Sequence, residues 1–134
     1  MLLWRGSKIY FYDEEDGRDY VGEFLESLAK EDPEQAVCIV ETFFERIENG
    51  VGIPYEWAKG KNPTLKKLQD NLWEYRERSK KLRKTIRIYF GVDGEAKTIV
   101  FVNAHFKKGD KDQSREIQTA LRRFRDYKKR RGII

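Results

Sequence analysis

The stretch VNAHFKKGDK, residues 102–111, joins an apolar segment typical of a strand to a basic segment typical of a helix. An imidazole titrates near neutral pH and can transfer a proton, whereas ammonium groups bind phosphate and stabilise developing negative charge. The stretch contains the only histidine of the chain, an aromatic ring and several lysines: His105, Phe106, Lys107, Lys108 and Lys111. This set of residue types is suited to binding a phosphodiester and cleaving it.

The alternation of residues in two neighbouring strands adds two arginines to this set. Residues 85–92 alternate apolar side chains with Arg87 and Tyr89, and residues 72–78 contain Arg76 in a similar alternating pattern. Because successive side chains of a strand point to opposite faces, one sheet face is apolar and the other presents both arginines. We expect that face to be half-exposed and to join the imidazole and the lysines in one concave, positively charged patch.

Such a patch has the groups that RNA cleavage without a metal requires. The 2′-OH must lose a proton, the charge of the phosphorane must be stabilised, and the leaving 5′-oxygen must gain a proton. Proton transfer is assigned to the imidazole or to a lysine whose pKa is lowered by cationic neighbours. The candidate catalytic residues are Arg76, Arg87, His105, Lys107, Lys108 and Lys111. The candidate RNA-binding residues are Tyr89 and Phe106, for base stacking, and Arg122 and Arg123 of a basic C-terminal helix.

Each of these features also has a purely structural interpretation. A lone histidine after an apolar strand is often structural, and arginines on an exposed strand face are usually only solvated. A basic helix can be a solvated face or a nonspecific anchor. No single feature is specific, and it is their order along the chain that favours a nucleic-acid site.

Composition sets the limits of the prediction. The 134 residues fit a single domain, residues 1–134, and the net charge is +5. Residues 1–50 hold 13 acidic and 5 basic side chains, a balance of −8, whereas residues 51–134 hold 10 acidic and 23 basic ones, a balance of +13. This asymmetry indicates that the C-terminal half meets a polyanion, or else that the two halves neutralise each other in the fold.

The chain has one cysteine, Cys38, with no Cys or His in metal-ligand spacing, so we expect neither a disulfide nor a metal. The N-terminus becomes polar too quickly for a signal peptide, and no apolar run is long enough to span a membrane. These observations predict a cytoplasmic protein with no membrane partner.

The predicted elements are a strand, two helices, three antiparallel strands and a final helix, which is an α+β arrangement. The first strand falls at residues 7–13, and the two helices, which we expect to pack as an antiparallel hairpin, follow from Tyr20 and from Asp32-Pro33. Residues 65–68 suggest a short helical turn before the strand at residues 72–78. Asp93-Gly94 marks the turn of the last strand pair.

Residues 64–127 resemble the HigB-like, phage-derived branch of the RelE/ParE toxin superfamily. The resemblance rests on LWEYR at residues 72–76, IRIYF at residues 86–90, HFKK at residues 105–108, and a basic helix that ends in Asp126-Tyr127. It implies a RelE-like fold, in which an N-terminal helical hairpin and a C-terminal helix pack on a small antiparallel sheet.

The resemblance also implies an activity and partners. Members of this branch are similar to ribosome-dependent mRNA endonucleases that act as the toxin of a type II toxin–antitoxin pair. Expected partners are mRNA, the ribosome and a helix-turn-helix antitoxin of the HigA type, and no cofactor is expected. Two alternatives stay open: a non-catalytic inhibitor of DNA gyrase, like the ParE side of the superfamily, and an RNA-binding module that has lost activity.

Overall fold

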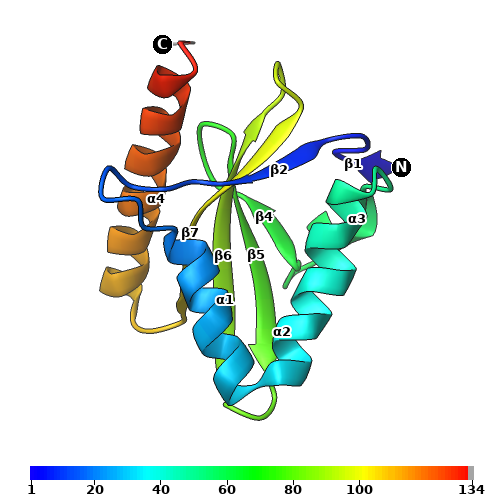
Figure 1. Ribbon diagram of the computed structural model, residues 1–134. Coiled ribbons are helices and arrows are strands. Elements are labelled where there is room, and N and C mark those ends of the chain that lie inside the picture. The colour runs from blue at the N-terminus through cyan, green and yellow to red at the C-terminus, as the bar shows by residue number, and fades with distance from the viewer. Residues whose placement is uncertain (133–134) are drawn as a thin grey trace.

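Seven strands form a five-stranded sheet and a separate two-stranded ribbon in the computed structural model, which describes residues 1–132 (Figure 1). The strands are β1 (Leu2–Leu3), β2 (Lys8–Phe11), β3 (Ile53–Pro54), β4 (Leu65–Lys67), β5 (Leu72–Ser79), β6 (Lys84–Asp93) and β7 (Thr98–Phe106). The sheet has the strand order β2-β7-β6-β5-β4, and β1 pairs with β3 outside it.

The helices lie on both faces of this sheet (Figure 1). They are α1 (Tyr20–Glu31), α2 (Pro33–Ile39), the π-helical segment η1 (Val40–Phe44), α3 (Glu45–Glu48), the 3-10 segment η2 (Tyr55–Ala58) and α4 (Asp110–Arg130). The helices from α1 to α3 cover one face, and α4 covers part of the other (Figure 1). Within residues 1–132, none of the helices has the length and apolarity needed to cross a membrane.

The structure is α+β, but the predicted arrangement, a small antiparallel sheet with an N-terminal helical hairpin, is wrong. The chain begins with strands, and β2 pairs in parallel with β7, Lys8 opposite Thr98, so that the sheet is mixed. The helices between β2 and the rest of the sheet provide the long crossover that a parallel pairing requires. The apolar pattern at residues 7–13 predicts a strand there, but it does not give the strand's direction or partner.

The helices α1 and α2 each begin directly after an aspartate that caps the helix. Asp19 accepts a hydrogen bond from the backbone N–H of Gly22 at 2.9 Å, and Asp32 accepts one from Gln35 at 3.3 Å. Pro33 occupies the first turn of α2, as predicted. The helical turn predicted at residues 65–68 is wrong, because β4 pairs there with β5, Leu65 opposite Tyr75.

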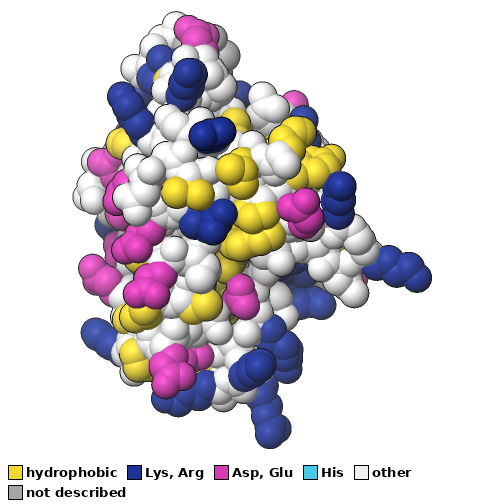
Figure 2. Space-filling model, turned by 90° about the vertical axis from the view of Figure 1, so that its right-hand side faces the viewer, with side chains coloured by type: hydrophobic (Ala, Val, Ile, Leu, Met, Phe, Trp, Pro, Cys, Tyr) yellow, Lys and Arg dark blue, Asp and Glu magenta, His cyan; other side chains and the backbone are white. Residues whose placement is uncertain are grey.

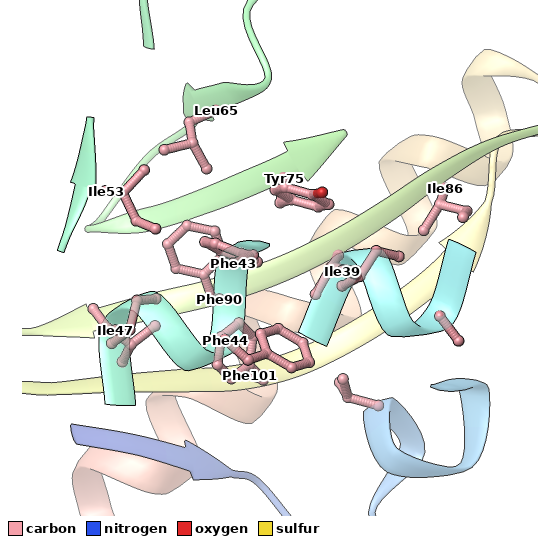
Figure 3. Packing of buried hydrophobic residues seen from close by; sticks show 14 of the residues in the cluster. Ile39, Phe43, Phe44, Ile47, Ile53, Leu65, Tyr75, Ile86, Phe90 and Phe101 are labelled. Atoms are coloured by element: carbon pink, nitrogen blue, oxygen red, sulfur yellow. The ribbon is translucent and has the colours of Figure 1, made fainter. Parts of the chain in front are cut away.

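The main core lies between the sheet and the helices from α1 to α3 (Figure 3). Phe43 of η1 stacks on Tyr75 of β5, with ring centroids 4.4 Å apart, and contacts Phe90 of β6 at 5.5 Å. All three side chains are fully buried. These contacts fix β5 and β6 relative to each other, and the outward-facing residues of the same strands carry the candidate site.

A second, smaller core holds α4 on the opposite face of the sheet. Phe124 and Ala120 of α4 pack with Leu72, Tyr89 and Val100 of the strands. Gly91 of β6 leaves the space for Phe124, since a Cβ added there would lie only 2.3 Å from the phenyl ring.

Gly91→Ala is therefore expected to lower the free energy of unfolding by about 1–3 kcal/mol, because the added methyl group overpacks the contact with Phe124. The measurement is urea unfolding followed by circular dichroism. Gly94→Ala is the matched control, because a Cβ at Gly94 meets no atom within 4 Å. Equal unfolding curves for the two variants would contradict this packing of α4.

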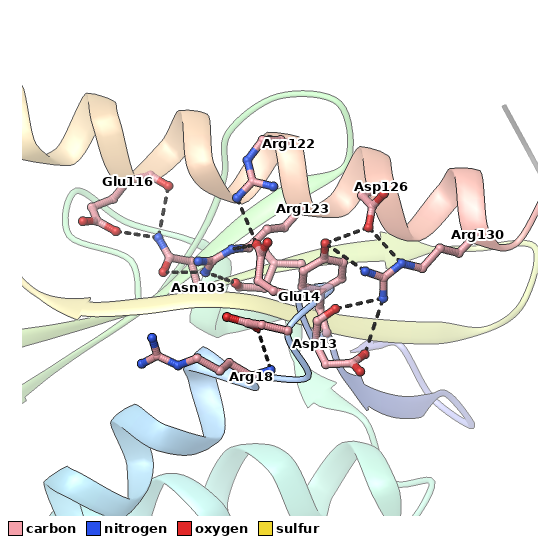
Figure 4. Close-up of polar contacts among 12 residues, drawn as sticks. Asp13, Glu14, Arg18, Asn103, Glu116, Arg122, Arg123, Asp126 and Arg130 are labelled. Carbon is pink, nitrogen blue, oxygen red and sulfur yellow. Dashed lines mark hydrogen bonds and ion pairs between the residues drawn. The ribbon is translucent and has the colours of Figure 1, made fainter.

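Ion pairs add to the attachment of α4 (Figure 4). The Glu14 carboxylate accepts hydrogen bonds from Arg122 at 2.9 Å and from Arg123 at 2.7 Å. Burial alone would raise the pKa of the Glu14 carboxyl, but the hydrogen bonds from these two arginines lower it below its ordinary value. Farther along α4, Arg130 donates to the carbonyl oxygen of Asp13 at 2.8 Å and pairs with its carboxylate at 3.5 Å. The segment between β2 and α1 is thereby tied to the helix.

Candidate functional site

Three of the predicted site residues form one row across the sheet. Arg76 of β5 lies opposite Arg87 of β6, and Arg87 lies opposite His105 of β7. The row therefore combines two guanidinium groups and one imidazole on the face that α4 covers in part. The predicted half-exposure of this face is wrong for the centre of the row, because Arg87 is only 5% exposed and His105 only 9%.

Arg87 is a buried cation with unused hydrogen-bond donors. Its Nε and Nη1 atoms have no hydrogen-bond partner within residues 1–132. The nearest carboxylate belongs to Glu74, with Oε2 3.6 Å from Nη1, which is an ion-pair distance rather than a hydrogen bond. Buried donors without partners cost free energy, so they are rare except where a ligand or an ordered water satisfies them.

The carboxylate of Glu74 forms ion pairs with both arginines. It is 1% exposed and lies 3.5 Å from Nε of Arg76 as well as 3.6 Å from Arg87. Gln113 of α4 donates a weak hydrogen bond to the same carboxylate at 3.4 Å. The carboxylate balances part of the positive charge while leaving the donors of Arg87 free.

Arg76 is fixed by the backbone as well as by Glu74. Its Nε and Nη2 atoms donate to the carbonyl oxygen of Pro63 at 3.3 and 2.9 Å. Its own backbone N–H donates to the carbonyl oxygen of Thr64 at 2.8 Å. The loop before β4 thus forms one wall of the site and holds this guanidinium in position.

A pocket of about 270 Å³ opens beside these groups. Lys107 extends the row of cations to the rim, and its backbone N–H donates to Thr85 of the neighbouring strand at 2.7 Å. This volume and this charge suit a phosphate group with part of a sugar. The residues that line the pocket include Pro63, Thr64, Arg76, Thr85, Arg87 and Lys107.

Both ring nitrogens of His105 are engaged within the protein. Nδ1 lies 2.8 Å from the carbonyl oxygen of Phe106, which can only accept, so Nδ1 carries a proton. In the neutral ring Nε2 then accepts the hydroxyl hydrogen of Tyr89 at 3.0 Å. Burial lowers the pKa of His105 below its ordinary value, which favours this neutral form. The proton-transfer role assigned to His105 stays a prediction.

The remaining predicted residues do not line the pocket. Lys108 is exposed just before α4, and Lys111 is exposed in the first turn of α4, close in sequence to Lys107. Phe106 packs on Phe24 of α1, with ring centroids 5.1 Å apart, so one side of its ring is already covered.

Two of the predicted RNA-binding residues are buried. Tyr89 is fully buried, so the ring that was expected to stack on a base has no free face. Arg123 is 7% exposed and donates to Glu14 and to the carbonyl oxygen of Val102, so it serves the attachment of α4 (Figure 4). Arg122 remains exposed, although it also pairs with Glu14. Tyr89 and Arg123 are therefore structural residues in this fold, contrary to the prediction.

Sequence reasoning missed Glu74 and Gln113 as parts of the site. Glu74 has the same parity as Arg76 on β5 and could have been assigned to the same face. Nothing in the local pattern indicates that Gln113 reaches it from α4. Among residues 1–132, no group of three or more His, Cys, Asp or Glu side chains is placed to hold a metal ion.

The family described as phage derived protein Gp49-like (DUF891) matches residues 55–125, just over half of the 134 residues. The match spans β5, β6, β7 and most of α4, and therefore the whole row of Arg76, Arg87 and His105. No curated protein and no solved structure matches the chain.

Proposed function

The chain belongs to the phage-derived Gp49-like family, and from that premise we propose that it is the toxin of a type II toxin–antitoxin pair. We propose further that it belongs to the HigB-like branch and cleaves mRNA on the ribosome. Its partners in this proposal are mRNA, the ribosome and a helix-turn-helix antitoxin.

The observation that carries the proposal is the buried Arg87, which lines a pocket together with Arg76 and Lys107. A guanidinium presents its donors in a planar fork that matches two oxygens of a phosphate. Arg76 and Lys107 add positive charge on either side. A phosphodiester bound there would neutralise the positive charge of the cluster.

The same groups support a cleavage step. The 2′-OH loses its proton to solvent water as its oxygen attacks the adjacent phosphorus, the P–O5′ bond breaks, and the products are a 2′,3′-cyclic phosphate and a 5′-hydroxyl. Arg87 and Arg76 stabilise the charge that develops on the phosphorane oxygens. The ammonium group of Lys107 at the rim is the proposed proton donor to the leaving 5′-oxygen. These charges are supplied by side chains, so the proposal does not require a metal ion.

His105→Gln is expected to reduce cleavage by less than about tenfold, since both ring nitrogens are already hydrogen-bonded within the protein. The measurement is the initial rate of mRNA cleavage by the variant and by the wild type. A general acid or base contributes about 10²–10⁴ in rate. A loss in that range, with an unchanged fold, would assign proton transfer to the imidazole.

The test of the proposed function is translation of a defined mRNA with purified components, followed by primer extension. New 5′ ends that appear only when ribosomes and the protein are both present would support it. Ends on naked RNA would mean a free ribonuclease. If no ends appear and the protein instead blocks DNA supercoiling by gyrase, the nuclease proposal is wrong.

A further inference from the structure

A groove between α1 and the segment of α2 and η1 has an apolar floor and lies away from the phosphate pocket. Its volume is about 440 Å³. Val37 of α2 is 53% exposed there, one of the most exposed large apolar side chains of residues 1–132. The floor consists of small and aliphatic side chains: Leu25, Ala29, Ala36, Val37 and Val40. Exposed apolar surface of this kind is typical of binding sites.

The rim of the groove is acidic. Glu26 of α1, Glu41 of η1 and Glu45 of α3 line it and are exposed. None of the three forms an ion pair with another residue in the part of the chain that the structure describes, residues 1–132. Their carboxylates are therefore available to a positively charged partner.

The charge of the whole molecule is divided in the same way. Figure 2 shows Asp and Glu side chains gathered at the left of the view, which is the side that faces the reader in Figure 1, where α1 and α2 lie. Lys and Arg side chains gather at the right and at the lower end (Figure 2). The acidic helical side repels RNA and attracts a basic partner.

The π-helical segment η1 contributes to the shape of the groove. It interrupts the helical segment between α2 and α3, and Val40 and Glu41 line the groove at this point. A π-turn contains an extra residue, which rotates the following side chains around the helix axis, and such turns are frequent at functional sites.

We propose that this groove docks an amphipathic helix of a partner protein, with aliphatic residues on the inner side and Lys or Arg on the flanks. Two helices side by side leave a trough into which a third helix packs its apolar stripe. The 12 residues of α1 extend about 18 Å, so three turns of a partner helix match its length. The charge of the rim selects Lys and Arg over Asp and Glu.

The groove and the phosphate pocket lie on opposite sides of the sheet. The helices α1 and α2 pack on the sheet face that includes Tyr75 and Ile88, whereas Arg87 points to the opposite face. A helix in the groove therefore leaves the Arg87 pocket open. The inference does not depend on the proposed nuclease activity, because it needs only the groove and its charge.

The test uses two labelled peptides of about 14 residues, each with a leucine face, one with lysines and one with glutamates on the other face. Fluorescence anisotropy with the full chain measures binding. The lysine peptide is expected to bind, and Val37→Glu should weaken it at least about tenfold, because a charge enters the apolar floor. Val51→Glu is the matched control, since Val51 is 45% exposed and lies outside the groove.

A second variant tests the selection by charge. Glu41→Lys is expected to weaken the lysine peptide and to strengthen the glutamate peptide at the same salt concentration. The inference fails if the lysine peptide does not bind the wild type. It also fails if Val37→Glu and Val51→Glu bind the peptide equally, or if Glu41→Lys leaves the preference unchanged.

Discussion

Arg87→Ala is expected to lower the rate of mRNA cleavage about 10²–10³-fold, the loss that follows removal of one donor from a preorganised anion site. The structure shows Nε and Nη1 of this residue buried without a hydrogen-bond partner. The substitution therefore breaks no hydrogen bond of these atoms but removes a guanidinium group that lines the pocket. Because Arg87 also pairs with the buried Glu74 carboxylate, the free energy of unfolding should fall as well, by up to about 3 kcal/mol. Single-turnover rates and a thermal unfolding curve measure the two effects separately.

Two control variants separate the effect of losing a positive charge from the effect of losing the guanidinium at this position. Arg115→Ala removes the same charge from an exposed place on α4 and should leave the rate within about twofold, because exposed charges contribute little. Arg87→Lys keeps the charge but loses the planar fork, so it should restore only part of the rate. If Arg87→Ala cleaves mRNA as fast as Arg115→Ala, Arg87 does not bind the reacting phosphate.

Glu74→Gln is expected to reduce cleavage about 10–100-fold and to destabilise the fold by about 3 kcal/mol. The carboxylate is 1% exposed and lies between two guanidinium groups, at 3.5 Å from Arg76 and 3.6 Å from Arg87. An amide of the same shape leaves the two cations without a counter-charge, so they repel each other and move apart. We expect the substitution to lower kcat and to change KM little, because the cations remain available to attract RNA.

Glu95→Gln is the control, because Glu95 is exposed in the turn between β6 and β7 and does not line the pocket. Glu74→Asp, which keeps the charge, should recover part of the rate. A positioning role predicts lower kcat with little change in KM for Glu74→Gln, and steady-state kinetics on ribosomes measure both constants. A change in stability with no change in kcat would leave Glu74 a purely structural residue.

The cation row was predictable from the sequence because it depends on strand parity. Arg76 and Arg87 have fixed places on alternating strands, and the pairing of β5 with β6 brings them opposite each other. The cluster of lysines after β7 was predictable for a similar reason, as it follows a well-marked strand. Local alternation places the two arginines on one face, whereas the pairing of β5 with β6 sets them directly opposite each other.

The burial of the row was not predictable in the same way. Alternation shows that the two faces of β6 differ, but it does not show that α4 folds over the polar one. That contact depends on Phe124 meeting Gly91 and on Arg123 reaching Glu14, which are far apart in the sequence. As a result, Tyr89 and Arg123 were assigned to RNA although they stabilise the fold.

The error in the sheet has a related cause. The residues of β2 have the strand pattern, and the same pattern fits antiparallel and parallel pairing. The helices between β2 and β3 form the crossover, and they allow β2 to join β7 in parallel at the sheet edge. This pairing leaves the row of Arg76, Arg87 and His105 unaffected, because β2 lies on the far side of β7.

The most direct test of the central claim is primer extension on one defined mRNA translated with wild type, Arg87→Ala or Arg115→Ala. We expect the same new 5′-hydroxyl ends with wild type and Arg115→Ala, paired with 2′,3′-cyclic phosphates upstream. We expect about 10²-fold fewer ends with Arg87→Ala. Equal cleavage by all three proteins, or no cleavage by folded wild type, would contradict the assignment of this pocket to mRNA cleavage.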